Sequence, residues 1–174
     1  MNEALSKRLK QYSVASPAHE ALLSLLLAAN RMNESFDVVC EEHGITRPQY
    51  NLLRILRGVH PKGHPRREIA CRMLERAPDV TRLVDRLETR GLVRRKRGNE
   101  DQRQAMTCIT RKGLKLLESM QPAMDDLLTA CFKRLSLSDC QELTRICAYI
   151  FACEPAPGEP RPPQPMAGGG HEGR

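Results

Sequence analysis

Residues 67–112 read REIACRMLERAPDVTRLVDRLETRGLVRRKRGNEDQRQAMTCITRK. Apolar residues recur at helical spacing from Ile69 and again from Val80, and two short strand-like runs follow Gly91. The predicted order is therefore two short helices, a basic strand, a polar turn and a second strand. This order is typical of a winged helix-turn-helix, in which one helix enters the major groove of DNA and a hairpin contacts the flanking backbone.

The basic charge of the chain is concentrated in this stretch. Residues 66–112 hold 14 of the 28 Lys and Arg residues but 7 of the 21 Asp and Glu residues, and their net charge of +7 equals that of the whole chain. Excess positive charge confined to one segment indicates a surface that meets a polyanion. A merely solvated basic face is the plain alternative, and the order of helices and strands argues against it.

Amphipathic helices are predicted on both sides of the winged unit. Before it, an apolar face runs at helical spacing from residue 18 to about residue 42, and its arc is wide enough to need cover on more than one side, as a subunit interface would provide. After it, helices are predicted over about 114–135 and from a capping box at 138–141 to about residue 153. The predicted fold class is mainly α with a small β-wing, a winged helix-turn-helix flanked by N- and C-terminal dimerisation helices.

The predicted organisation is one domain with a terminal segment on each side. The tail carries six Pro and five Gly, a composition that cannot form a packed core and predicts disorder. The segments are a flexible arm or short helical lead-in over 1–17, a single domain over 18–153 (dimerisation helices 18–45 and 113–153, winged helix-turn-helix 46–112) and the tail 154–174.

The helix predicted from Pro78 to Gly91 has one apolar and one polar face. Its apolar face carries Val80, Leu83, Val84 and Leu87. On the opposite face, the candidates for contacts to base edges are Thr81, Arg82 and Arg86, because hydroxyl and guanidinium groups pair with guanine edges and phosphates. In the following strand, four consecutive cations are candidates for phosphate contacts, although strand alternation turns about half of them away: Arg94, Arg95, Lys96 and Arg97.

Composition excludes several other classes. Aromatic residues make up 3% of the chain and Trp is absent, which argues against a base-stacking platform for single strands. The chain has no apolar run of membrane-spanning length, so a cytoplasmic protein without membrane contact is predicted. The seven cysteines are odd in number and lack CxxC spacing, so neither a disulfide framework nor a metal site is expected. Without a nucleophile–base pair or a phosphate-binding glycine loop, neither an enzyme nor a cofactor is predicted.

Two segments resemble the MarR (multiple antibiotic resistance regulator) family of transcriptional regulators. Residues 80–93, VTRLVDRLETRGLV, are similar to its recognition helix and strand entry, and Asp101-Gln102-Arg103 followed by Ile109-Thr110 and Lys112-Gly113 resembles its wing motif. The resemblance implies a homodimer on a palindromic operator in double-stranded DNA, with Arg103 in the minor groove and Asp101 holding it by a salt bridge. It also implies a regulator, more often a repressor, that responds to a small aromatic or lipophilic effector.

Two other functions are compatible with the sequence. The seven cysteines allow a thiol sensor of the same fold, for which Cys71 and Cys153 are the best-placed residues. The winged fold also allows a module for protein contacts. Steep salt dependence of binding would favour DNA over a protein partner.

Overall fold

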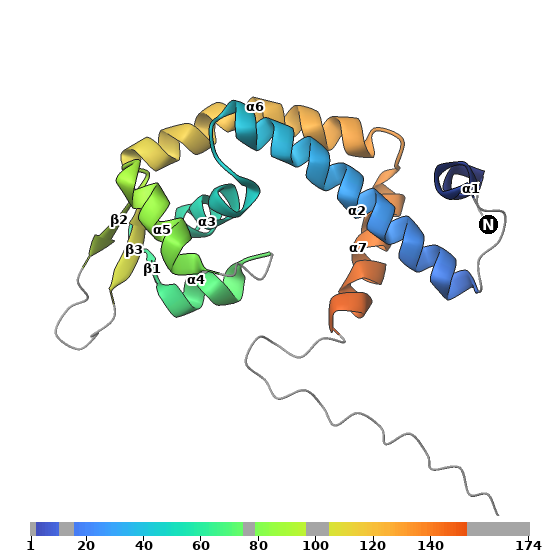
Figure 1. Cartoon of the computed structure of the whole chain (residues 1–174), viewed down its shortest axis with the longest axis horizontal. Helices are drawn as coiled ribbons and strands as arrows, with labels where there is room; N and C mark the ends of the chain where they lie inside the picture. The colour runs from blue at the N-terminus through green and yellow to red at the C-terminus, as the bar shows by residue number, and fades with distance from the viewer. Residues whose placement is uncertain (1–2, 11–15, 75–78, 97–104, 153–174) are drawn as a thin grey trace, which may run out of the picture. The chain divides into compact units, whose positions relative to one another are not determined.

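The computed structural model describes residues 3–10, 16–74, 79–96 and 105–152 (Figure 1). The chain forms two compact units, Met1–Cys131 and Phe132–Arg174. Nearly all elements belong to the first unit: α1 (Glu3–Leu9), α2 (Pro17–Glu42), α3 (Arg47–Arg57), β1 (His64–Pro65), α4 (Arg66–Arg72), α5 (Val80–Thr89), β2 (Val93–Lys96), β3 (Met106–Ile109) and α6 (Arg111–Phe132, whose last residue falls in the second unit). The second unit contains α7 (Leu137–Ala152).

Helix α2 begins where the sequence supplies a cap and a proline. Ser16 Oγ accepts a hydrogen bond from His19 N at 3.2 Å, and Pro17 occupies the start of the helix, where its missing N–H costs little. Of the 26 residues of this helix, all of them described, only Cys40 is buried. The predicted apolar face is therefore largely open in the single chain, with Leu22 52% and Leu26 51% exposed.

The core lies between the winged unit and the helices beside it. Its largest fully buried aliphatic side chains come from α3, α4, α5, β2 and α6: Leu52, Leu53, Leu56, Ile69, Leu87, Val93, Leu117 and Met120. Each such burial contributes about 1.5–3 kcal/mol of transfer free energy. Because α5 puts its apolar stripe into this core, its polar side chains are left facing solvent.

The two helices of the predicted helix-turn-helix are α4 and α5. The sequence predicts the second helix from Pro78, which lies outside the described residues, but α5 begins at Val80. The reason is that Asp79 has a non-helical backbone and caps the helix, its Oδ1 accepting a hydrogen bond from Arg82 N at 3.1 Å. The predicted stripe is confirmed, since Val80, Val84 and Leu87 are buried.

The wing strands form a three-stranded antiparallel sheet with the order β1-β3-β2. Strand β2 pairs Val93 with Ile109 and Lys96 with Met106, and β1 pairs His64 with Thr107. The approach to β1 requires a glycine: Gly63 has φ +80°, and a Cβ there would lie 2.3 Å from Thr107 O. Strand β1 thus joins the start of α4 to the wing.

The last helices depart from the prediction in detail. Helix α6 runs from Arg111 to Phe132, three residues earlier than the predicted 114–135, and continues through Pro122, which lies on its exposed side. Helix α7 begins at Leu137, and its capping box is Ser136 with Asp139 rather than the predicted 138–141. Ser136 Oγ accepts from Asp139 N at 3.1 Å and Asp139 Oδ2 accepts from Ser136 N at 2.8 Å, so both halves of the box are satisfied two residues earlier.

Within the described part of the chain, no helix is long and apolar enough to cross a membrane.

Candidate nucleic-acid interface

The exposed face of α5 carries two arginines, of which one forms an ion pair and the other has no described partner. Arg82 Nε lies 3.0 Å from Asp79 Oδ2 in an ion pair whose side chains are 78% and 43% exposed. Such exposed pairs exchange readily with solvent and contribute about 0–1 kcal/mol. Arg86 is exposed, and no described residue bonds to its side chain. Both guanidiniums are therefore available to an acceptor outside the chain.

Arg95 fastens the wing to α5. Its Nη1 donates to Glu88 Oε2 at 2.7 Å, its backbone N donates to Glu88 Oε1 at 2.8 Å, and its Nη2 donates to Asp85 Oδ1. The hydrogen bond to Asp85, helped by the nearby Glu88 charge, raises the pKa of the Arg95 guanidinium. The sequence prediction assigns Arg95 to phosphate, whereas the structure engages it with two carboxylates of α5.

The neighbouring cations of β2 point to the solvent. Arg94 and Lys96 are exposed, and no described residue bonds to either side chain. They alternate with Arg95 along the strand, so these two share one face of the hairpin. Three predicted site residues, Arg97, Asp101 and Arg103, lie outside the described residues.

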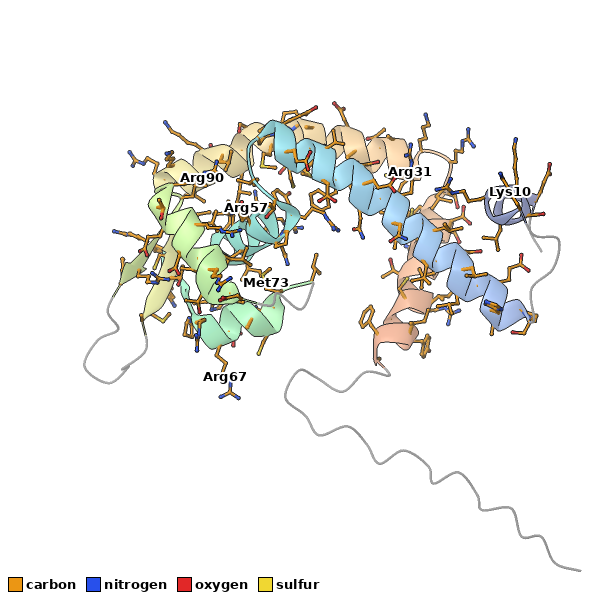
Figure 2. All side chains as sticks on the ribbon, in the orientation of Figure 1. Lys10, Arg31, Arg57, Arg67, Met73 and Arg90 are labelled. Carbon is orange, nitrogen blue, oxygen red and sulfur yellow. The ribbon has the colours of Figure 1, made fainter. Side chains whose placement is uncertain are left out.

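A second connection joins α4 to the first turn of α5. Arg66 Nη1 donates a hydrogen bond to Thr81 Oγ1 at 3.0 Å. The two residues line an open hollow of about 680 Å³ with Arg67, Val84, Asp85, Arg95, Ala105 and Thr107. In Figure 2 Arg67 projects from α4 away from the ribbon. The sequence prediction did not include Arg66 or Arg67, whose only signal was a pair of cations at a helix start.

The base of the wing is bonded to α6. Thr110 Oγ1 donates to Gly91 O at 2.7 Å and accepts from Gly113 N at 3.1 Å, so it caps α6 while holding the end of α5. Lys112 Nζ donates to Arg90 O at 2.8 Å. Gly113 permits the contact, since a Cβ there would lie 2.4 Å from Leu92 O.

A smaller hollow of about 280 Å³ opens between α2, α3 and the end of α4. Phe36 of α2 meets Tyr50 of α3 edge to face at 5.2 Å, and the Arg54 guanidinium lies 6.0 Å from the centre of the Tyr50 ring. Asn51 Nδ2 donates to Met73 Sδ at 3.8 Å at its edge. The lining thus combines aromatic and aliphatic surface with a cation and an amide.

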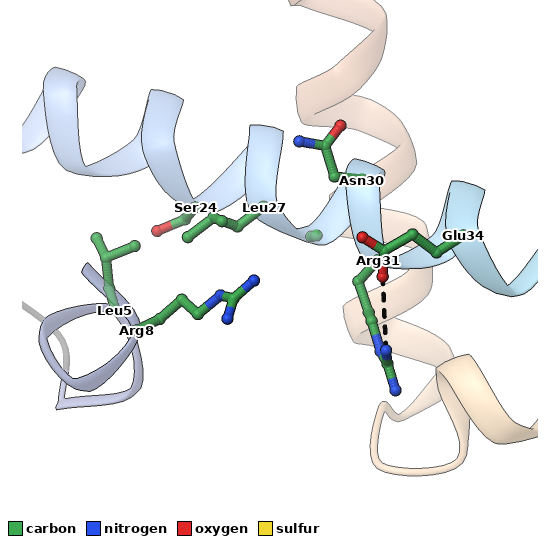
Figure 3. A pocket seen from close by; sticks show the side chains of 8 residues that line it. Leu5, Arg8, Ser24, Leu27, Asn30, Arg31 and Glu34 are labelled. Atoms are coloured by element: carbon green, nitrogen blue, oxygen red, sulfur yellow. Dashed lines mark ion pairs between the residues drawn. The ribbon is translucent and has the colours of Figure 1, made fainter. Parts of the chain in front are cut away.

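Another hollow, of about 670 Å³, lies between α1 and α2 (Figure 3). Leu5 and Arg8 of α1 face Leu27 and Arg31 of α2 across it, and Arg31 pairs with Glu34 at 3.5 Å. The segment 1–17 therefore includes a short helical lead-in, with Leu5 only 5% exposed.

The cysteines differ in accessibility. Burial, followed by the charge of Asp37, raises the pKa of Cys40 to about 11, which removes it from thiolate chemistry near neutral pH. Cys108 is also buried, and its Sγ donates to Lys62 O at 3.4 Å. Cys71 on α4 is exposed, whereas Cys153 lies outside the described residues. Among the residues that the structure describes, no group of His, Cys, Asp and Glu could hold a metal ion.

Comparison with known proteins identifies the family. A sequence model of the MarR family matches residues 45–105. A MarR transcription factor from Planctomyces limnophilus is 35% identical to this chain, with a TM-score of 0.61 over 79% of this chain and 99% of that one. The chain belongs to the MarR family. It is therefore a transcriptional regulator and not an enzyme, and the predicted winged helix-turn-helix is confirmed.

Other known proteins share either sequence or fold with it. The homoprotocatechuate degradative operon repressor of Escherichia coli is 25% identical over 135 residues, 77% of this chain and 90% of that protein. Sco3205 from Streptomyces coelicolor, in complex with DNA, has a TM-score of 0.69 at 23% identity over 84% of this chain and 94% of that one. CouR from Rhodococcus jostii RHA1, bound to p-coumaroyl-CoA, has a TM-score of 0.69 at 19% identity over 79% and 95%. For Sco3205 and CouR, the similarity to this chain is one of fold alone.

Proposed function

We propose that this MarR-family regulator is a cytoplasmic homodimeric repressor that binds a palindromic operator in double-stranded DNA. The observation that carries the proposal is α5, whose apolar stripe is buried while Arg82 and Arg86 stand exposed on the opposite face. Guanidinium groups on an exposed helix are hydrogen-bond donors, and the major-groove edge of guanine presents the matching acceptors. A related protein named as an operon repressor and a DNA-bound neighbour of the same fold support it.

The residues divide by role. Thr81, Arg82 and Arg86 contact base edges in the major groove, and Arg94, Lys96 and Arg97 neutralise phosphates. Arg103 enters the minor groove and Asp101 holds it in position. Arg95 acts differently from the sequence prediction: bonded to Asp85 and Glu88, it orients the wing on α5 and leaves phosphate to its neighbours.

Dimerisation is proposed through the helices that flank the winged unit. The described part of α7 contains no buried residue, and its apolar side chains are open to solvent, with Ile146 43%, Ile150 54% and Phe151 67% exposed. Helix α2 likewise leaves Leu22 and Leu26 half exposed. Exposed apolar faces of this extent indicate a protein interface. Two subunits related by a two-fold axis would present two recognition helices about 34 Å apart, one turn of DNA.

The effector is proposed to bind in the hollow between α2, α3 and the end of α4. Its lining of Phe36, Tyr50, Met73 and Leu74 suits a small aromatic or lipophilic molecule, and Arg54 supplies a positive charge at its edge. A neighbour of the same fold bound to p-coumaroyl-CoA supports ligand response. Because the hollow joins a flanking helix to the winged unit, occupancy would change the spacing of the two readers, for which a coupling of about 1–3 kcal/mol is sufficient.

The decisive experiment is selection of bound duplexes from a random pool, followed by titration of the winning sequence at several salt concentrations. A palindrome with half-sites one helical turn apart, and affinity that falls steeply with salt, are expected. Arg86→Ala should weaken binding by about 1–3 kcal/mol and relax one position of the site. Arg31→Ala, which removes the same charge from α2 outside the winged unit, serves as the control. Failure to enrich any sequence would contradict the proposal.

Two alternatives have their own readouts. A thiol sensor would lose DNA affinity after peroxide treatment through Cys71, which is exposed on α4. Unchanged affinity after oxidation removes that alternative. A protein-interaction module would show no sequence enrichment and only weak salt dependence.

A further inference from the structure

Two threonines on α5 differ in what their hydroxyls can do. Thr89 Oγ1 donates to Asp85 O, one turn earlier in the same helix, at 2.9 Å. Its proton is therefore used within the protein. Thr81 is the second residue of α5, so the helix offers no carbonyl one turn before it. No described residue accepts a hydrogen bond from Thr81 Oγ1, so none of them uses its proton.

Arg66 determines the direction in which the Thr81 hydroxyl bonds. A hydroxyl has one donor and two acceptor lone pairs. Arg66 Nη1 donates to Thr81 Oγ1 at 3.0 Å and occupies one of those lone pairs with a cation. The hydroxyl keeps its proton and one lone pair for other partners, and the adjacent cation disfavours a second donor at that lone pair, so Thr81 is presented chiefly as a hydrogen-bond donor.

The position of Arg66 is itself fixed by the wing sheet. Arg66 is the first residue of α4 and directly follows Pro65, which pairs with Met106 of β3. The hollow beside Thr81 is also electropositive. Arg66 and Arg67 have no described carboxylate partner, whereas Asp85, the one acid among the described lining residues, is bonded to Arg95. A donor hydroxyl beside uncompensated cations favours an electronegative edge of a base.

We propose that Arg66 is a specificity-determining residue that acts through Thr81, so that the first turn of α5 prefers a base presenting an acceptor. Guanine, with O6 and N7, and thymine, with O4, meet this requirement in the major groove, and adenine meets it at N7 beside its N6 donor, whereas cytosine presents only the donor N4. This inference rests on the proposed DNA-binding function. It assigns Arg66 a role in base preference, distinct from a uniform attraction to phosphate.

The test compares duplex selection by the full chain and by five variants. Thr81→Val removes the hydroxyl at constant shape, Arg66→Met removes its partner, and Arg66→Lys restores a single cationic donor. Arg67→Met and Arg67→Lys are the matched controls, since they change the charge of the next residue along α4. Thermal unfolding of each variant checks that the fold is kept. A duplex panel carrying each of the four base pairs at every position of the selected half-site then gives the preferences as ratios of affinity.

Thr81→Val and Arg66→Met should relax the same position of the half-site, reducing the preference for guanine or thymine over cytosine by about fivefold, the worth of one hydrogen bond. Arg66→Lys should restore part of it. Arg67→Met should weaken all sequences alike. An Arg66→Met protein that keeps the wild-type preference at every position, whatever its affinity, would overturn the inference, as would Thr81→Val with unchanged preference. A wild-type chain that selects no sequence would instead refute the proposed function.

Discussion

The link between the wing and α5 makes a prediction about the sign of a charge effect. The double variant Asp85→Asn/Glu88→Gln makes the surface that is proposed to face DNA more positive by two charges. Long-range electrostatics alone would then predict tighter DNA binding. We expect weaker binding, because Arg95 loses both carboxylate partners and β2 is no longer fastened to the recognition helix.

The magnitude follows from exposure. The side chains of Arg95, Asp85 and Glu88 are 38%, 51% and 34% exposed, so each ion pair contributes about 0.5–1 kcal/mol after solvent screening. Losing both pairs costs at most about 1–2 kcal/mol per subunit, because the amide side chains retain part of the hydrogen bonding. The opposing gain from two removed charges is about 0.3 kcal/mol each at physiological salt. The net expectation is binding weaker by about two- to tenfold per subunit.

The assay is fluorescence anisotropy of the selected duplex at three salt concentrations, with thermal unfolding measured in parallel. Glu118→Gln is the control, because Glu118 is exposed on α6 and no described residue bonds to it. A double-mutant cycle with Arg95→Met should show that most of the effect of the acid substitutions disappears once the arginine is gone. Tighter DNA binding by the double variant, with an unchanged unfolding midpoint, would refute the reasoning.

Three further outcomes are expected from the described contacts. Gly113→Ala should lower the stability measured by urea unfolding by about 1–3 kcal/mol, although alanine normally favours a helix, because its Cβ would meet Leu92 O at 2.4 Å. Burial, and then the charge of Arg72, lowers the pKa of His64 below its ordinary 6.5, so the unfolded chain takes up a proton at a higher pH than the folded chain does. The unfolding midpoint should therefore be level above pH 6.5 and fall below it. The fall should be smaller in His64→Asn. A thiol reagent at pH 8 should modify Cys71 in the folded protein and Cys40 only after unfolding; equal rates would contradict the assigned burial.

The sequence predicts what depends on local periodicity. The stripe of Val80, Val84 and Leu87 follows from helical spacing, and the wing strands follow from alternation bounded by turn residues. These features give the helix order, the sheet and the exposed face of α5. They are sufficient to place Arg82 and Arg86 on the solvent side.

Helical spacing and strand alternation do not predict which side chains of different elements contact one another. Arg95 meets Asp85 and Glu88 only because β2 packs along α5 in one register, and four consecutive cations in sequence do not distinguish the one that turns inward. Arg66 bonds to Thr81, 15 residues later, through the packing of α4 on α5. The cap of α7 shows a different limit, since Ser136 and Ser138 are both acceptable caps by residue type, and the Asp139 carboxylate selects the first.

The hydrogen bonds around Thr110 form a rigid connection between α5 and α6. One hydroxyl ties Gly91, at the end of α5, to the first turn of α6, and Lys112 adds a second tie to Arg90. Because Gly113 brings the two backbones into direct contact, we expect a rotation of α6 to move the end of α5 with it instead of being absorbed by a loop. Under the proposed function, a shift of about 1 Å in α6 would therefore be transmitted to the end of α5, because packed contacts switch between discrete arrangements and do not deform continuously.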